Sequence, residues 1–184
     1  MVTAGGLFRQ QEKPGRMHRQ ESICSRKLDE TESKNMTDYK ILTAQLEALT
    51  DGVEDTISNL ANAAALLFMS LDNINWAGFY ILKDGLLKLG PFMGKPACVK
   101  IMIGKGVCGT AAERDETVVV PDVHAFPGHI ACDAESASEI VIPLHADGQL
   151  FGVLDIDSPV KDRFSPEDAA GLENFAAILE RVLH

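Results

Sequence analysis

The feature that most constrains the fold is a pair of alternating segments, 139–146 and 149–157, joined by Asp147-Gly148. An Asp-Gly pair readily adopts the positive φ angles of a two-residue hairpin turn, so it predicts two adjacent antiparallel strands. A second hairpin is predicted upstream, where Asp84-Gly85 separates two further strand-like segments, 75–82 and 86–92. Two hairpins in one short chain favour an antiparallel sheet.

Helical periodicity precedes the first hairpin and follows the last. Apolar side chains recur three and four positions apart over 41–49 and 53–68, and Ser165-Pro166 opens a C-terminal helix with an N-cap and a proline at the first helical position. The segments in between read as a strand, a short helix and a strand: 97–103, 107–114 and 117–120. Strands bracketed by helices predict an α+β fold, a central antiparallel sheet with helices packed on its faces.

Composition and charge set the expected class of protein. Residues 1–35 have no apolar run and no strong periodicity, so we expect a disordered N-terminal extension followed by one soluble domain at 36–184. The extension carries seven basic and five acidic residues, so the chain's net charge of −10 leaves −12 on the body. That charge argues against a nucleic-acid partner, and no apolar stretch is long enough to span a membrane. Four cysteines without a secretory signal indicate the cytoplasm.

A long polar loop is predicted between the strands at 117–120 and 139–146. It carries Cys132 between His129 and Asp133, and loops of this length within a compact domain are usually functional. Asp133 disfavours a thiolate at Cys132, whereas a protonated His129 would favour one. The sequence leaves that balance open.

The body contains two further cysteines, Cys98 and Cys108. No C-x-x-C pair is present, so neither a zinc knuckle nor a thioredoxin-type motif is expected. Each cysteine alone could be a small buried hydrophobe, but three in one body, with one on a polar loop, favour redox chemistry. Cys108 begins the helix predicted at 107–114, and the dipole of that helix is expected to favour the thiolate.

Two acids on the last predicted strand are candidates for proton transfer. Asp155 and Asp157 are two residues apart and share one face, while Leu154 and Ile156 fill the other. Mutual repulsion and partial burial would raise their pKa values, so a carboxyl could stay protonated and act as a general acid. The alternative is a solvated strand end with no chemical role.

Aromatic residues on the first predicted strand form a candidate substrate-binding face. Trp76 and Tyr80 flank Gly78, a spacing that predicts a shallow gap between two rings for a small ligand. The alternative is ordinary core packing.

Six ordered motifs give the chain a resemblance to a known family. They are Asn75-Trp76-Ala77-Gly78-Phe79-Tyr80, Leu89-Gly90-Pro91-Phe92, Gly104-Lys105-Gly106-Val107-Cys108-Gly109-Thr110, Gly128-His129-Ile130-Ala131-Cys132-Asp133, Ser138-Glu139-Ile140-Val141 and Gly152-Val153-Leu154-Asp155-Ile156-Asp157-Ser158. Together they resemble the free methionine-(R)-sulfoxide reductases, enzymes built on a GAF domain, over about residues 40–183. Several motifs in order, with matching cysteines, are more specific than a GAF resemblance alone.

The resemblance implies a role for each candidate residue. Cys132 corresponds to the nucleophile, Cys98 to the principal resolving cysteine and Cys108 to an alternative one. The acids that hold the sulfoxide oxygen correspond to Glu139, Asp155 and Asp157, and the aromatic wall beside the substrate's methyl end corresponds to Trp76. The implied reaction reduces the free amino acid through a sulfenic acid and a disulfide.

The resemblance also sets expectations about partners. Electrons would come from an external dithiol, such as a thioredoxin-like protein, so neither a cofactor nor a metal is expected. The family often dimerises, so a homodimer is a further expectation. Two alternatives stay open: a GAF-type sensor module that binds a small molecule without catalysis, and a divalent metal site built from Glu139, Asp155, Asp157 and a histidine.

Overall fold

A computed structural model describes Met1, residues 37–128 and residues 134–184 of the chain. The chain divides into two units, Met1–Met36 and Thr37–His184, and the second contains every element described below. In chain order these are α2 (Tyr39–Thr50), α3 (Thr56–Ser70), β1 (Trp76–Lys83), β2 (Leu86–Gly94), β3 (Lys100–Met102), α4 (Gly106–Arg114), β4 (Val118–Val120), the short 3-10 helix η2 (Val123–Ala125), β5 (Ser138–Ala146), β6 (Gln149–Ser158) and α5 (Pro166–Glu180).

The six strands form one sheet in the order β3-β2-β1-β6-β5-β4, and every neighbouring pair is antiparallel. Both predicted hairpins are confirmed: β1 pairs with β2, and β5 pairs with β6. Their turns have positive φ at both central residues, 55° and 74° at Asp84-Gly85 and 51° and 73° at Asp147-Gly148. The sequence-distant strands β1 and β6 meet in the middle of the sheet, which joins the two hairpins into one unit.

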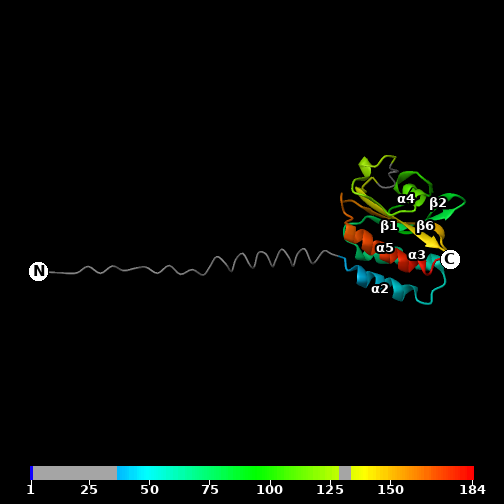
Figure 1. Cartoon of the computed structure of the whole chain (residues 1–184), viewed down its shortest axis with the longest axis horizontal. Helices are drawn as coiled ribbons and strands as arrows, with labels where there is room; N and C mark the ends of the chain where they lie inside the picture. The colour runs from blue at the N-terminus through cyan, green and yellow to red at the C-terminus, as the bar shows by residue number, and fades with distance from the viewer. Residues whose placement is uncertain (2–36, 129–133) are drawn as a thin grey trace. The chain divides into compact units, whose positions relative to one another are not determined.

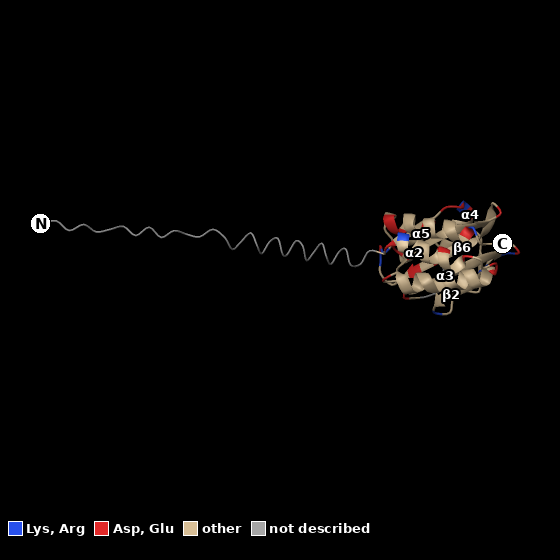
Figure 2. Ribbon diagram, turned by 90° about the horizontal axis from the view of Figure 1, so that it is seen from below, with Lys and Arg blue, Asp and Glu red and all other residues tan. Residues whose placement is uncertain are grey.

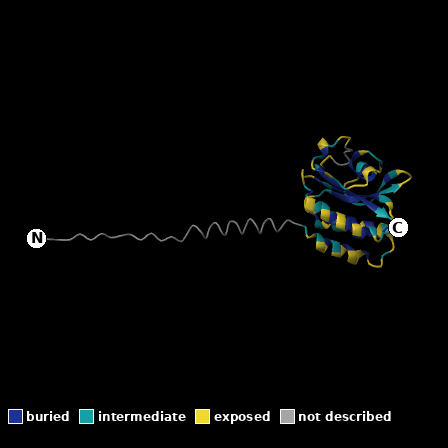
Figure 3. Cartoon of the chain, in the orientation of Figure 1, coloured by how far each residue is buried: buried dark blue, intermediate teal, exposed yellow. Residues whose placement is uncertain are grey.

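The helices lie on opposite faces of this sheet in the second unit. Helices α2, α3 and α5 cover one face and α4 covers the other (Figure 1). The strands between the layers are largely buried, whereas the helices expose their outer sides (Figure 3). This arrangement confirms the predicted α+β class.

Each central strand divides its side chains between the two layers. Phe79 and Leu154 pack with the three-helix layer, and Tyr80 and Val153 pack with α4. The predicted alternation of β1 and β6 is therefore confirmed, because successive strand residues point to opposite faces.

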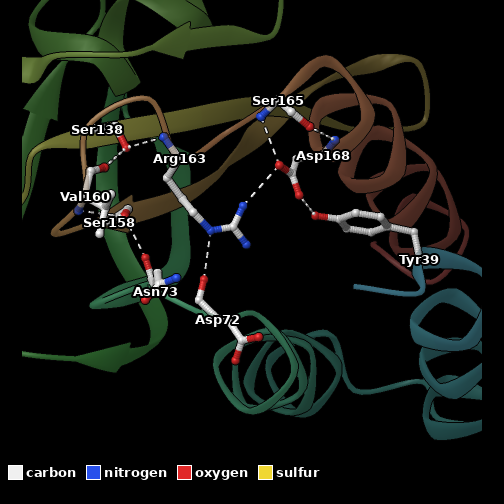
Figure 4. Close-up of polar contacts among 9 residues, drawn as sticks. All are labelled: Tyr39, Asp72, Asn73, Ser138, Ser158, Val160, Arg163, Ser165 and Asp168. Carbon is white, nitrogen blue, oxygen red and sulfur yellow. Dashed lines mark hydrogen bonds and ion pairs between the residues drawn. The ribbon is translucent and has the colours of Figure 1, made fainter. Parts of the chain in front are cut away.

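A polar network fixes the strand ends and the C-terminal helix (Figure 4). Asp168 completes a capping box with Ser165 and also accepts hydrogen bonds from Tyr39 Oη at 2.5 Å and Arg163 Nη1 at 3.1 Å. These contacts tie α2 to the start of α5. At the ends of β5 and β6, Ser138 Oγ donates to Val160 O and Ser158 Oγ donates to Asn73 O, both at 2.6 Å.

Two predicted elements differ from the structure. The strand expected at 97–103 is only Lys100–Met102, because the chain before it makes a single ladder-like bond, Leu89 N to Val99 O at 3.1 Å. The predicted loop also contains η2, which the sequence pattern did not indicate. Asp122 initiates that turn by accepting a hydrogen bond from His124 N.

The surface of the helical layer carries little positive charge. The three helices α2, α3 and α5 contain five acidic residues and a single basic one, Lys40. Figure 2 views this layer and shows Lys and Arg as isolated positions among the acids. Across the described residues, every helix is too short or too polar to cross a bilayer.

His145 links the two helical layers at one end of the sheet. Its Nδ1 lies 3.0 Å from Glu180 Oε1 at the end of α5, and its Nε2 lies 2.8 Å from Asp115 Oδ1 after α4. Partial burial would lower the pKa of His145, but hydrogen bonds to the two carboxylates and their charges outweigh it, so the pKa is raised. The imidazolium form therefore stabilises the fold.

We expect His145→Gln to destabilise the protein more at pH 6 than at pH 9. A raised folded pKa contributes stability that is complete below the unfolded value, about 6.5, and lost as pH rises through the folded value. The imidazole is about one-third exposed, so the loss at pH 6 should be about 0.2–1 kcal/mol. Chemical denaturation at both pH values measures it, with His184→Gln as the control. Equal losses at both pH values would contradict this origin.

Candidate active site

Three buried groups from three elements meet under α4. Cys108 of α4, Glu139 of β5 and Asp155 of β6 each place one potential ligand atom within 4.8 Å of the others. Cys108 Sγ lies 3.9 Å from Glu139 Oε1. The three residues are only 4%, 6% and 6% exposed, so their charges are largely removed from water.

The register of the central strands assembles the acidic part of this site. Asp157 pairs with Glu139 on one side and with Trp76 on the other, and Asp155 pairs with Val141 and Gly78. Directly paired residues point to the same face of a sheet. The predicted common face of Asp155 and Asp157 is confirmed, and Asp155 is buried rather than at a solvated strand end.

Glycines bring the thiol close to these acids. Helix α4 begins after Gly104, and Gly104 and Gly106 have φ of 76° and 63°, which L side chains rarely adopt. A Cβ added to Gly109 would lie 2.3 Å from the carbonyl oxygen of Met102. Because glycine allows this close backbone contact, α4 packs directly on the end of β3, and Cys108 lies against the sheet.

Burial controls the protonation of the cluster. Desolvation, followed by the charges of Asp155 and Asp157, raises the pKa of Glu139 well above its usual value. Desolvation also raises the pKa of Asp155 from 3.8 to about 6, against hydrogen bonds with Cys108 and Glu139 that lower it. Asp155 Oδ1 is buried and has no hydrogen-bond partner among the described residues. A carboxyl that holds its proton near neutrality can donate it to a ligand.

The expected activation of Cys108 is wrong. Its pKa is raised, chiefly by burial and then by the charges of Asp155 and Glu139. These effects outweigh the dipole of α4, because the thiol is removed from water and faces two acids. Cys108 therefore remains a thiol at neutral pH.

Trp76 forms the aromatic wall of the site. Its ring stacks between Tyr80, with centroids 6.0 Å apart, and Phe92, at 5.3 Å. Its Nε1 donates to the carbonyl oxygen of Lys95 at 3.1 Å. A Cβ added to Gly78 would lie 2.7 Å from the indole Cη2 atom. The predicted gap between the Trp76 and Tyr80 rings is thus wrong, because the indole itself covers Gly78.

A small cavity joins the aromatic wall to the acids. Its described lining residues are Trp76, Tyr80, Lys95, Pro96, Ala97, Asp155 and Asp157. The space available to the centre of a water-sized sphere is about 10 Å³, close to one water molecule. An apolar ring and a buried carboxyl of raised pKa, that of Asp155, on one cavity suit a ligand with an apolar group beside a hydrogen-bonding oxygen.

The remaining predicted cysteines lie in different situations. Cys98 is a half-buried free thiol between β2 and β3, packed against the same core cluster as Trp76. Cys108 is also free. Cys132, with its neighbours His129 and Asp133, lies outside the described residues.

Sequence reasoning missed the groups that position the wall and the loop. Lys95 holds the indole through its carbonyl oxygen and forms an ion pair with Glu135. Asn75 Nδ2 donates to Ser136 Oγ at 3.1 Å, so the end of the loop is also tied to the start of β1. A buried Trp needs an acceptor for its N–H, but the sequence does not say which carbonyl provides it.

The buried cluster also has the chemistry of a metal site. A thiolate and two carboxylates could bind Zn²⁺, whose donors at about 2.0–2.3 Å would lie roughly 3.5 Å apart. The donor atoms here spread over as much as 4.8 Å, and burial favours their protonated forms. The arrangement fits shared protons better than a metal ion.

Comparisons with known proteins identify the family of the chain. The GAF domain model matches residues 45–183. Free methionine-R-sulfoxide reductase of Escherichia coli is 54% identical over 145 residues, covering 79% of this chain and 88% of that protein.

Solved structures of similar proteins indicate the same family. The structure of fRMsr of Staphylococcus aureus in complex with substrate is 51% identical with a TM-score of 0.78, covering 82% of this chain and 98% of that one. Free methionine-R-sulfoxide reductase from Neisseria meningitidis, in complex with its substrate, is 44% identical with a TM-score of 0.76, covering 78% and 87%. The chain therefore belongs to the GAF-domain family of free methionine-R-sulfoxide reductases.

Proposed function

We propose that this protein is an oxidoreductase that reduces free methionine-(R)-sulfoxide to methionine. The observation that carries the proposal is the buried carboxyl of Asp155, whose pKa is raised to about 6 on the cavity walled by Trp76. A sulfoxide sulfur becomes a good electrophile only when its oxygen is protonated or strongly hydrogen-bonded. The relatives whose names state this activity support the choice of substrate.

In the first step, the acid cluster activates the sulfoxide. Asp155 and Glu139 hydrogen-bond the oxygen and supply a proton, while the Trp76 ring packs against the methyl end. The Cys132 thiolate attacks the sulfur, and as the oxygen passes to the Cys132 sulfur, the substrate S–O bond and the new bond between the two sulfurs both break. Methionine leaves, and Cys132 has become a sulfenic acid by a two-electron oxidation.

In the second step, a resolving thiol removes the sulfenic acid. Its sulfur attacks the Cys132 sulfur, which forms a disulfide and releases water. We assign this role to Cys98, because Cys108 is buried beside two acids that keep it protonated. Cys108 then serves mainly as a hydrogen-bond partner within the acid cluster.

An external dithiol completes the cycle by thiol-disulfide exchange. We propose a thioredoxin-like protein as this donor, and the thiols of the chain as the only redox groups, without a metal or an organic cofactor. Such a cycle requires a compartment that keeps dithiols reduced, so we propose the cytoplasm as its location. A homodimer is the proposed assembly.

The second candidate function is ligand sensing. A GAF fold alone does not determine activity, and a cavity with buried acids could bind a small molecule without thiol chemistry. Catalytic use of the cysteines separates the two functions.

The first test counts methionine released without reductant. We expect Cys132→Ser to abolish even one turnover, because a serine hydroxyl cannot take up the oxygen as a sulfenic acid. Cys98→Ser should release about one equivalent per chain and then slow or stop. Rapid-quench analysis with mass spectrometry of linked peptides gives both results.

Cys24→Ser is the matched control and should behave like the wild type. A full first turnover in Cys132→Ser would assign the nucleophile to another cysteine. Absence of turnover in the wild type would favour the sensor.

The second test measures two effects of Asp155 separately: its contribution to the turnover number and the effect of its burial on the free energy of unfolding. We expect Asp155→Asn to lower the turnover number about 10²- to 10⁴-fold, as for a positioned general acid. Because the pKa of Asp155 is about 6 in the folded protein and 3.8 in the unfolded chain, the free energy of unfolding falls as pH rises through this range. An uncharged amide does not titrate, so Asp155→Asn removes this loss of stability. The free energy of unfolding should therefore rise by about 1–3 kcal/mol at pH 8 and change little at pH 4.

Asp72→Asn, at an exposed position, is the control for both measurements. Near-normal turnover in Asp155→Asn would return this residue to a structural role. A lower stability at pH 8 would contradict the raised pKa.

A further inference from the structure

Lys95, which lines the small cavity, forms an exposed ion pair with Glu135. Lys95 Nζ is 2.5 Å from Glu135 Oε2, and the two side chains are 54% and 69% exposed. Lys95 also holds Trp76 through its carbonyl oxygen. The pair therefore connects the β2–β3 segment to the end of the loop before β5.

Charge makes Lys95 distinctive at this position. It is the single cationic side chain among the described residues that line the cavity, whereas Asp155 and Asp157 are acidic. A carboxylate ligand would be repelled by whichever of these acids is ionised, so a cation on the same lining favours its binding. A free amino acid carries such a carboxylate, and a residue within a peptide does not.

The different burial of Asp155 and Lys95 sets the expected orientation of the ligand. Both residues line the cavity, but Asp155 is 6% exposed whereas the Lys95 side chain is 54% exposed. A sulfoxide at the buried acid leaves the amino-acid end of the same molecule beside the Lys95 ammonium.

We propose that Lys95 binds the α-carboxylate of the substrate and thereby selects the free amino acid. Glu135 is its exchange partner, which pairs with Lys95 until the substrate carboxylate replaces it. This inference rests on the proposed function for the identity of the substrate. Replacement of Glu135 by the substrate carboxylate costs little free energy, because an exposed ion pair contributes little stability.

The main experiment compares Lys95→Met with the wild type on two substrates. For free methionine sulfoxide we expect KM to rise about two- to fivefold, the range for an exposed ion pair, with kcat unchanged. For the methyl ester of methionine sulfoxide, which has no carboxylate, KM should stay unchanged. Lys88→Met is the matched control, because Lys88 forms an exposed ion pair with Asp84, also at 2.5 Å.

Glu135→Gln tests the exchange. Removing the competing carboxylate should lower KM for the free amino acid about two- to fivefold. An increased KM in this variant would overturn the exchange role, because Glu135 would then bind the substrate itself. An equal rise in KM for both substrates in Lys95→Met would overturn the carboxylate role and leave Lys95 as a support for the wall.

Binding can be measured without turnover, because Trp76 is the one tryptophan of the chain. Its fluorescence reports binding of L-methionine and of L-methionine methyl ester. Wild-type preference for the acid, lost in Lys95→Met, supports the inference even if no reduction occurs, which would refute only the proposed function. Equal affinity of the wild type for both probes would overturn the inference even if reduction does occur.

Discussion

The structure depends on the antiparallel pairing of β1 with β6 in the middle of the sheet. Each hairpin can form from local sequence, but only this long-range pairing joins the two and places Asp155 opposite Gly78. The same ladder divides the side chains, so Phe79 and Leu154 supply one core while Tyr80 and Val153 supply the other. A slip of one residue would move the acids into the helical layer.

The site carries a stability cost that the rest of the fold must offset. Carboxyls are rarely buried, and here Glu139 and Asp155 are buried together beside a thiol. The strand ends beside the cluster are anchored: Ser138 precedes Glu139, Ser158 follows Asp157, and both serines donate hydrogen bonds to backbone carbonyls. The polar network of Figure 4 thus holds the β5 and β6 ends in register next to the chemistry.

Much of the fold could be predicted from local patterns. The two Asp-Gly turns, the alternation of β1 and β6 and the cap at Ser165 are all decided within a few residues of sequence, and each is confirmed. Edge elements were less predictable: β3 is shorter than its apolar pattern because few ladder bonds form there.

The site was only partly predictable, because its properties arise from contacts between distant segments. The common face of Asp155 and Asp157 follows from strand geometry, and the family resemblance added Glu139. The raised pKa of Cys108 was not foreseen, because its helix-terminal position suggested the opposite and its neighbours come from β5 and β6. The stacking of Phe92 on Trp76 depends on a register shift between Gly78 and Tyr80 that no sequence pattern encodes.

The described walls of the small cavity differ in how firmly the chain holds them. On the inner side, Asp155 and Asp157 belong to a central strand whose backbone is bonded on both edges. Among the described residues, the outer side is the connection Lys95-Pro96-Ala97, held by the indole hydrogen bond and a surface ion pair. Any rearrangement of the described lining is therefore expected in this connection, while the sheet acts as a fixed template.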